Sequence, residues 1–189
     1  MEIACKIFIK GLVQGVGFRP FIFRLATETG IKGWVKNTNE GVEIFAQAEN
    51  DGLNTFIHQI KLDHPVAAVI NDIQSVPSTP AELTDFSIHG SENRSLEVTG
   101  IAPDIAVCED CLADMEEQPS RKSYPFINCT NCGPRFSIIR DLPYDRKKTS
   151  MSVFPMCASC TKEYDDIRDR RFHAQPVACL HRGPTYKLH

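Results

Sequence analysis

The stretch Gly11–Pro20 reads GLVQGVGFRP and directly follows the short apolar run Ile7–Ile9. Glycine has no Cβ, so the backbone N–H groups around it can turn toward a single point. Inward N–H groups form a concavity that binds anions, and the start of a following helix adds partial positive charge. A guanidinium at the end of such a loop matches the oxygens of a phosphate. We therefore predict a phosphate-binding site that consists of Gln14, Gly15, Val16, Gly17, Phe18 and Arg19.

Two better-known phosphate loops do not fit this stretch. No Gly-Lys-Ser/Thr follows, so it is not a P-loop. No acidic residue follows a βαβ crossover at the distance that a dinucleotide-binding fold requires. A tight turn without any ligand remains the alternative, because glycine is also the usual turn residue.

The residues on both sides of the loop predict an α+β domain over residues 1–90. Alternating apolar residues indicate strands, and apolar residues at helical spacing indicate helices, the second of them with Asn50 or Asp51 as its N-cap. The order β-α-β-β-α-β is the ferredoxin-like plan, in which two helices cover one face of an antiparallel sheet. The predicted elements are strand Cys5–Ile9, helix Pro20–Thr29, strands Ile31–Lys36 and Val42–Ala48 around a turn at 37–41, helix Asp51–Leu62, and strands Val66–Val76 and Phe86–His89.

The composition is that of an ordinary globular protein, with 42% hydrophobic and 24% charged residues in 189. No segment approaches eighteen consecutive apolar residues, and the N-terminus lacks the features of a secretory signal. A net charge of −3 argues against binding by neutralisation of nucleic-acid phosphates. We expect a cytoplasmic protein that binds neither membranes nor nucleic acid.

Cysteine usage changes sharply after the first domain, since seven of the eight cysteines lie in the last 82 residues. Paired C-x2-C spacing in a chain without a secretory signal indicates a metal site rather than disulfides. Two such knuckles supply four thiolates, which is the ligand set of a structural tetrahedral Zn²⁺ site. The sequence therefore predicts a zinc-binding domain over residues 108–189, after a linker at 91–107, with Cys108, Cys111, Cys129, Cys132, Cys157, Cys160 and Cys179 as ligands.

These cysteines belong to an internal repeat, with modules at about 108–135 and 157–185. Offsets of 49 and 50 residues superimpose the cysteines and an upstream basic pair, Arg121-Lys122 on Arg170-Arg171. Arg182 stands where the first module has Cys132, so the second site lacks a cysteine. We favour His181 as the fourth ligand. His173, a three-coordinate or weak site, and pairing of knuckles across the modules are the alternatives.

The first domain resembles the acylphosphatase family. The strings KGLVQGVGFRPF and GWVKNTNEGVEIFAQ match the family's G-x-V-Q-G-V-x-F-R and G-W-V-x-N-x-x-x-G in order and separation. The resemblance implies a ferredoxin-like fold and hydrolysis of acyl phosphates. It also implies that Arg19 and the loop amides bind the phosphate, while Asn37 positions the attacking water. The alternative for Asn37 is a hairpin-turn residue.

The metal-binding part, with YPFINCTNCGPRFSIIRDLPYDR and DRRFHAQPVAC, makes the whole chain resemble the front end of the HypF carbamoyltransferases of [NiFe]-hydrogenase maturation. This resemblance implies carbamoyl phosphate as substrate, Zn²⁺ in two sites and a HypE-like partner of the full-length protein. The family's adenylation and transfer domains are expected to be absent from this polypeptide. A non-catalytic module that binds phosphate and presents a zinc-stabilised interaction surface is the alternative function.

Overall fold

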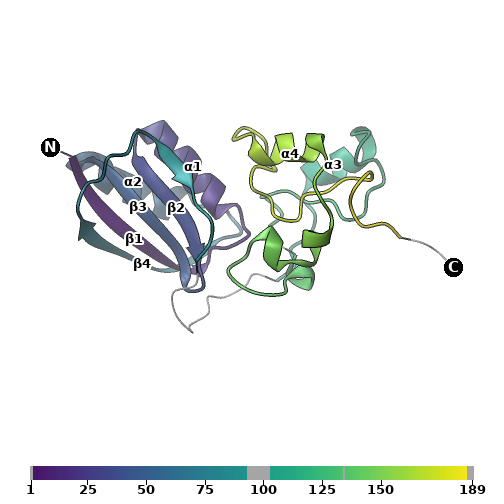
Figure 1. Cartoon of the computed structure of the whole chain (residues 1–189), viewed down its shortest axis with the longest axis horizontal. Helices are drawn as coiled ribbons and strands as arrows, with labels where there is room; N and C mark the ends of the chain where they lie inside the picture. The colour runs from purple at the N-terminus through teal and green to yellow at the C-terminus, as the bar shows by residue number, and fades with distance from the viewer. Residues whose placement is uncertain (1, 93–102, 134, 187–189) are drawn as a thin grey trace.

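The computed structural model describes residues 2–92, 103–133 and 135–186. It has two halves, a β-sheet with two helices at the N-terminal side and a loop-rich, cysteine-containing half at the C-terminal side (Figure 1). Most of the predicted linker at 91–107 lies outside the described residues, so that boundary stays a prediction. In the described ranges, no helix is long and apolar enough to cross a membrane.

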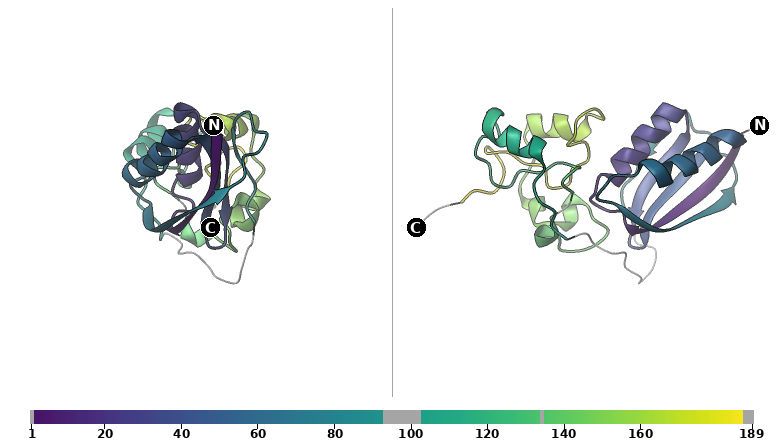
Figure 2. Two further views of the ribbon diagram at one scale, coloured as in Figure 1. Left: turned by 90° about the vertical axis from the view of Figure 1, so that its left-hand side faces the viewer. Right: turned by 180° about the vertical axis from the view of Figure 1, so that it is seen from behind.

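The N-terminal half is the predicted ferredoxin-like domain. Its sheet has the strand order β4-β1-β3-β2-β5, antiparallel throughout except where β5 runs parallel to β2. Both helices cover one face of this sheet (Figure 2), and the apolar side chains between the two layers form the core. The elements are β1 (Glu2–Leu12), α1 (Phe18–Thr29), β2 (Lys32–Thr38), β3 (Gly41–Glu49), α2 (Asn50–Asp63), β4 (Val69–Ser78) and β5 (Phe86–Ile88).

The sequence located these elements well and their ends less well. Helix α1 starts two residues before Pro20, because the left-handed Gly17 (φ 75°) ends the loop and lets the helix begin at Phe18. It stops at left-handed Gly30, as predicted. Glu49, in an extended conformation and without a side-chain cap, is the N-cap of α2, so the prediction of Asn50 or Asp51 is wrong.

The β2–β3 hairpin has a shorter turn than predicted. Strand β2 continues to Thr38, and only Asn39 and Glu40 form the turn. Asn37 pairs with Val42 in the β2–β3 ladder, and its φ is not positive. Its position is therefore not explained by a turn that tolerates a left-handed backbone.

The C-terminal half contains the two repeated modules. Each begins with a short helix directly after its first cysteine, α3 (Glu109–Glu117) after Cys108 and α4 (Ala158–Asp165) after Cys157. Three 3-10 helices lie between the modules: η1 (Phe136–Ile138), η2 (Arg146–Lys148) and η3 (Ser150–Val153).

The modules are joined by reciprocal arginine contacts. Arg121 of the first module donates from Nε to the carbonyl of Ala178 (3.2 Å), and Arg171 of the second does the same to Asn128 (3.2 Å). Each also forms an ion pair with an acid on the other module's helix, Arg121 with Glu163 and Arg171 with Asp114. In the structure, Arg121 therefore corresponds to Arg171. The sequence alignment, which placed Arg121 on Arg170, is wrong by one residue.

Candidate functional site

The glycine loop between β1 and α1 is fixed by its own glutamine. Gln14 is buried, and its Nε2 donates to the carbonyls of Thr38 (2.6 Å) and Gly41 (3.0 Å) in the β2–β3 hairpin. Gly15 and Gly17 both have φ of 75°, a left-handed conformation that glycine adopts without strain. The loop and the hairpin are therefore held together at one end of the sheet.

The loop also packs against the first cysteine module. A Cβ on Gly17 would lie 3.1 Å from the Cβ of Thr130, inside the Cys129–Cys132 knuckle. On the same knuckle, a Cβ on Gly133 would lie 3.8 Å from the carbonyl oxygen of Gly15. The predicted anion site and the first metal site thus share a wall.

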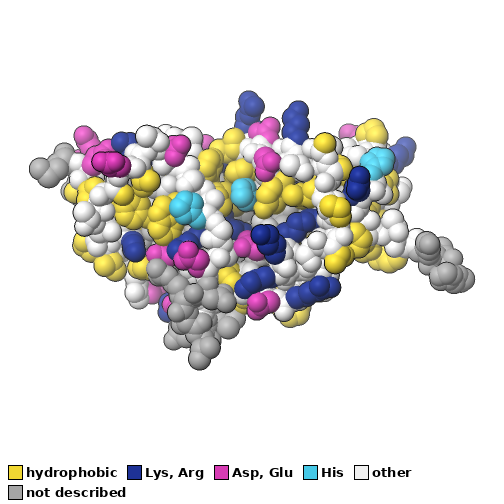
Figure 3. All heavy atoms as spheres, in the orientation of Figure 1, with side chains coloured by type: hydrophobic (Ala, Val, Ile, Leu, Met, Phe, Trp, Pro, Cys, Tyr) yellow, Lys and Arg dark blue, Asp and Glu magenta, His cyan; other side chains and the backbone are white. Residues whose placement is uncertain are grey.

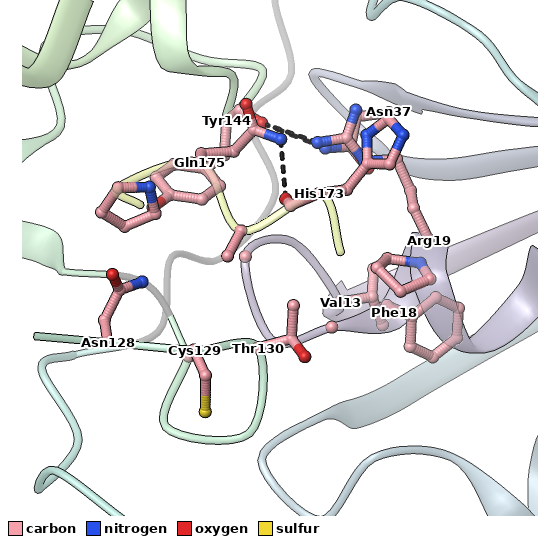
Figure 4. A pocket seen from close by; sticks show the side chains of 16 residues that line it. Val13, Phe18, Arg19, Asn37, Asn128, Cys129, Thr130, Tyr144, His173 and Gln175 are labelled. Atoms are coloured by element: carbon pink, nitrogen blue, oxygen red, sulfur yellow. Dashed lines mark hydrogen bonds between the residues drawn. The ribbon is translucent and has the colours of Figure 1, made fainter. Parts of the chain in front are cut away.

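Arg19 and Asn37, the predicted catalytic residues, line the same cavity. Arg19 lies in the first turn of α1 and is 7% exposed, and Asn37 lies on β2 and is 0% exposed. Figure 4 shows both side chains beside Tyr144, with His173 close by. The structure thus brings together residues from a loop, a helix and a strand.

A segment that the sequence analysis gave no role covers this cavity. The Tyr144 carbonyl accepts hydrogen bonds from Arg19 Nη2 (3.3 Å) and from Asn37 Nδ2 (3.3 Å). The Tyr144 N–H donates to Gln14 Oε1 (2.9 Å), and Asp145 Oδ1 pairs with Arg19 Nη1 at 3.0 Å. We call Leu142–Arg146 the roof segment. Its sequence lies within the string that resembles HypF, but no local pattern indicates that it meets a loop about 130 residues earlier.

The cavity under the roof segment is small and polar. It has about 20 Å³ of space for the centre of a water molecule, enough for one ordered water. In the described part of the chain, Asn37 Oδ1 is buried without a hydrogen-bond partner. A buried carbonyl oxygen without a partner costs free energy, and a water in this cavity would remove that cost. Asn37 Oδ1 is therefore available to accept a hydrogen bond from a ligand or a water.

His173 faces Arg19 and Asp145 rather than a metal site. Burial and, to a lesser extent, the positive charge of Arg19 lower the pKa of His173 from 6.5 to about 4, with Asp145 opposing the shift. The ring is therefore neutral near pH 7. Its left-handed backbone (φ 55°) is a feature of the repeat, because Ser123 holds the matching position with φ 56°. His173 lies outside the second cysteine group, so the alternative that made it a ligand is not supported.

The first cysteine group has the geometry of a tetrahedral zinc site. The Sγ atoms of Cys108, Cys111, Cys129 and Cys132 all lie within 4.8 Å of one another. Two of these separations are 3.5 Å and 3.9 Å, against about 3.8 Å for the edge of a tetrahedron with Zn–S bonds of about 2.3 Å. Both are far longer than a disulfide bond. The knuckles of one module thus meet each other, not those of its repeat.

The second group contains three cysteines. Sγ atoms of Cys157, Cys160 and Cys179 lie within 4.8 Å of one another, with 3.7 Å between Cys157 and Cys179. His181, the predicted fourth ligand, is exposed and does not join them. In the first module, the third residue of the knuckle, Asn131, is exposed in the same way. The first module directs the first and fourth residues of this knuckle inward, whereas the fourth residue of the second module, Arg182, is exposed.

Arginines lie beside the thiols of both groups. Arg170 donates to Cys111 Sγ (3.1 Å) and Arg135 to Cys132 Sγ (3.5 Å), while Arg121 reaches Cys160 Sγ (3.7 Å). Hydrogen bonds from the thiols of Cys111 and Cys129 lower the pKa of Cys132. The pKa values of Cys111, Cys129 and Cys160 are raised instead, so the arginines alone do not convert all of these thiols to thiolates, the form that binds metal. Both groups suit zinc, the first as a closed set of four ligands and the second as an open set of three.

Two family models match the chain. One, described as Acylphosphatase, matches residues 5–88, and the other, described as HypF finger, matches residues 107–139 and 156–189. A curated relative from Rhodobacter capsulatus, named Carbamoyltransferase HypF, is 43% identical over 98% of this chain. The chain belongs to the HypF family.

Structural comparison agrees with the HypF assignment. A crystal structure of full-length HypF in a phosphate- and nucleotide-bound form matches 98% of the chain at 50% identity, with a TM-score of 0.93. The chain spans only about a quarter of the length of these HypF proteins, 25% in both cases. An acylphosphatase from Thermotoga petrophila is 40% identical, and 94% of its length is matched, so the N-terminal half is an acylphosphatase domain.

Proposed function

We propose that this chain binds the phosphoryl group of an acyl phosphate in the cavity under the roof segment and hydrolyses it, with carbamoyl phosphate as substrate. The observation that supports this most is the pairing of groups in one enclosed cavity. Arg19 supplies positive charge, and the Oδ1 of Asn37 is a buried acceptor without a partner. These are the two groups that hydrolysis of an activated phosphate requires.

In the proposed reaction the protein stabilises charge and places a water. The loop amides of Gln14–Phe18 and the guanidinium of Arg19 hold the phosphoryl oxygens, on which negative charge spreads in the transition state. Asn37 Oδ1 accepts a hydrogen bond from the attacking water and directs its lone pair toward phosphorus. The bond from the water oxygen to phosphorus forms as the P–O bond to the carboxylate or carbamate breaks, and the water proton passes to the phosphate product or to the leaving group. No strong base is needed, because the leaving carboxylate or carbamate is a good leaving group.

The cysteine groups take a structural part in this proposal. The first, with four thiolates, holds Zn²⁺ with no open position, and the second holds it with three protein ligands. Reduced cysteines of this kind fit a cytoplasmic location. In a longer HypF protein the chain would provide the carbamoyl phosphate site of a carbamoyltransferase, whose product passes to a HypE-like partner.

The test is release of inorganic phosphate by the purified chain from carbamoyl, acetyl and benzoyl phosphate. We expect turnover by the wild type and a loss of at least 100-fold in kcat/KM for Arg19→Ala. Arg24→Ala, on the same helix and outside the cavity, is the matched control and keeps the wild-type rate. Absence of phosphate release from all three substrates contradicts the proposal.

A second candidate is a module that binds phosphate without turnover. Two observations favour it. Arg19 is already paired with Asp145, and the cavity has space for about one water, so a bound phosphoryl group would leave no room for an attacking water. Binding of inorganic phosphate to the wild type, together with absence of turnover, would support this candidate.

A further inference from the structure

We propose that Asp145 and the carbonyl of Tyr144, both from the metal-binding half, are positioning groups for the two catalytic residues of the acylphosphatase domain. This inference rests on the proposed function. It makes the active site composite: the acylphosphatase domain supplies the groups that touch substrate, and the roof segment sets their orientation.

The first argument comes from the contacts of Arg19. An arginine side chain has several rotatable bonds, and holding it in one rotamer costs free energy. Asp145 Oδ1 binds Nη1 at 3.0 Å and the Tyr144 carbonyl binds Nη2 at 3.3 Å. These contacts use two of the five N–H donors of the guanidinium and leave the others for a phosphoryl group. Asp145 contacts the guanidinium through one oxygen only. It therefore fixes the plane of the group without occupying all the donors that a phosphoryl group would use.

The second argument comes from Asn37. Its role requires the amide to present oxygen, not nitrogen, to the cavity. The Tyr144 carbonyl can only accept, so it binds the NH2 group (3.3 Å) and leaves Oδ1 as the free atom. One backbone oxygen thus sets the orientation of both catalytic side chains.

The third argument is that the roof segment is itself held from the other side. Arg146 donates to the carbonyls of Gln175 (2.7 Å), Val177 (2.8 Å) and Phe154 (2.6 Å). Its backbone N–H binds Gln175 Oε1 (2.8 Å). The half-buried guanidinium of Arg146, with two carbonyl partners in the second module and one just before it, anchors the segment. A positioning group needs such support, because a displacement of about 1 Å can cost about 100-fold in rate.

The opposite role for Asp145 would be competition with phosphate for Arg19. The two roles predict opposite results when the charge is removed. If Asp145 positions Arg19, its loss decreases kcat. If Asp145 competes with phosphate, its loss decreases KM and leaves kcat unchanged.

The experiment compares Asp145→Asn with Asp141→Asn in the full 189-residue chain. Asp141 lies in the same stretch, pairs with Lys148 and has a 68% exposed side chain, so its substitution removes the same charge without touching the cavity. We expect Asp145→Asn to lower kcat for carbamoyl phosphate at least tenfold with KM changed less than threefold. Asp145→Glu, which keeps the carboxylate, restores part of the rate, and Asp141→Asn behaves as wild type.

A double-substitution cycle tests whether Asp145 acts through Arg19. We expect Asp145→Asn to have no further effect on kcat/KM in the Arg19→Ala background. Equal kcat and lower KM in the single variant, or additive losses in the double variant, would overturn the proposal.

A second measurement does not depend on turnover. The NMR order parameter of the Arg19 Nε–H bond, assigned by its loss in Arg19→Ala, should be that of a rigid group in the wild type and should fall in Asp145→Asn. An unchanged order parameter would contradict the positioning role. Absence of wild-type turnover with the expected NMR change would instead reject the proposed function alone.

Discussion

The two cysteine modules descend from one sequence pattern, yet different contacts hold them. The first has four buried or half-buried thiols in tetrahedral arrangement. The second has three thiols and an exposed arginine at the fourth position, but it receives a buried guanidinium from the first module, Arg121, beside Cys160. The first module receives the same kind of contact from the second, because Arg170 donates to Cys111 Sγ (3.1 Å). The comparison teaches that the two modules share their arginine contacts and differ in the fourth ligand position.

The modules also serve the candidate active site differently. The knuckle of the first module packs against the glycine loop through Thr130 and so forms a wall. The second contributes His173 and Gln175, and its carbonyls hold Arg146 and thereby the roof segment. On the face drawn in Figure 3, the two halves of the molecule form one continuous surface, with lysines and arginines gathered over the metal-binding half.

The largest expected effect on stability and zinc content comes from substitution of Cys132, the fourth ligand position of the first module. Cys132→Ser removes a thiolate from the closed set, and structural zinc sites contribute on the order of 10 kcal/mol to folding. We expect loss of one zinc, partial unfolding and loss of phosphate release, because the wall beside the glycine loop is lost. Zinc content and thermal unfolding measure this change.

Arg182→Ser is the matched control at the equivalent position of the second module. Arg182 is exposed, so we expect the free energy of unfolding to change by less than about 0.5 kcal/mol and zinc content to stay unchanged. Similar losses in the two variants would mean that the modules are held in the same way.

The next effect concerns the contact between the modules. Arg121 is 1% exposed and binds Glu163, Gln118 and the carbonyl of Ala178. Arg121→Ala removes the nearest cation of the half-buried Glu163, which keeps only Arg171 at 3.9 Å and Gln118 at 3.2 Å, so we expect a loss of about 3 kcal/mol in urea unfolding. Arg168, with a 90% exposed side chain, is the control, and its substitution by Ala should cost less than about 0.5 kcal/mol. A cost under about 1 kcal/mol for Arg121→Ala would show that metal alone holds the second module.

A smaller effect should appear as a dependence of stability on pH. Burial beside Arg19 lowers the pKa of His173 to about 4, while the unfolded chain keeps a value near 6.5. As the pH decreases, the imidazole of His173 therefore becomes protonated in the unfolded chain before it does in the folded one. The contribution of neutral His173 is complete above pH 6.5 and falls by about 3 kcal/mol as the pH decreases to 4.

His173→Asn tests this dependence and keeps a residue that tolerates the left-handed backbone. Urea unfolding between pH 6.5 and 4 should show a shallower loss of stability for the variant than for the wild type. Parallel curves would mean that His173 is not the group responsible.

The fold was predictable because its signals are local. Alternation in β1, helical spacing in α1 and the C-x2-C pairs each lie within about a dozen residues. The spacing of the cysteines also predicted which sulfur atoms the structure brings together. His181 is exposed and lies outside the group of three cysteines. Chain proximity does not show which way a knuckle directs its side chains. The roof segment could not be predicted, because Asp145 meets Arg19 across 126 residues and Tyr144 contributes backbone atoms, which carry no residue signal.

The central claim is that the cavity under the roof segment performs hydrolysis, with Asn37 holding the water. The most direct test is Asn37→Ala in the full chain, with kcat for carbamoyl phosphate and inhibition by inorganic phosphate measured on one preparation. The account predicts a fall of about 100-fold in kcat with the affinity for inorganic phosphate unchanged, because water placement acts in the transition state. A variant that loses phosphate affinity in proportion to its rate, or that keeps the wild-type rate, would contradict the account.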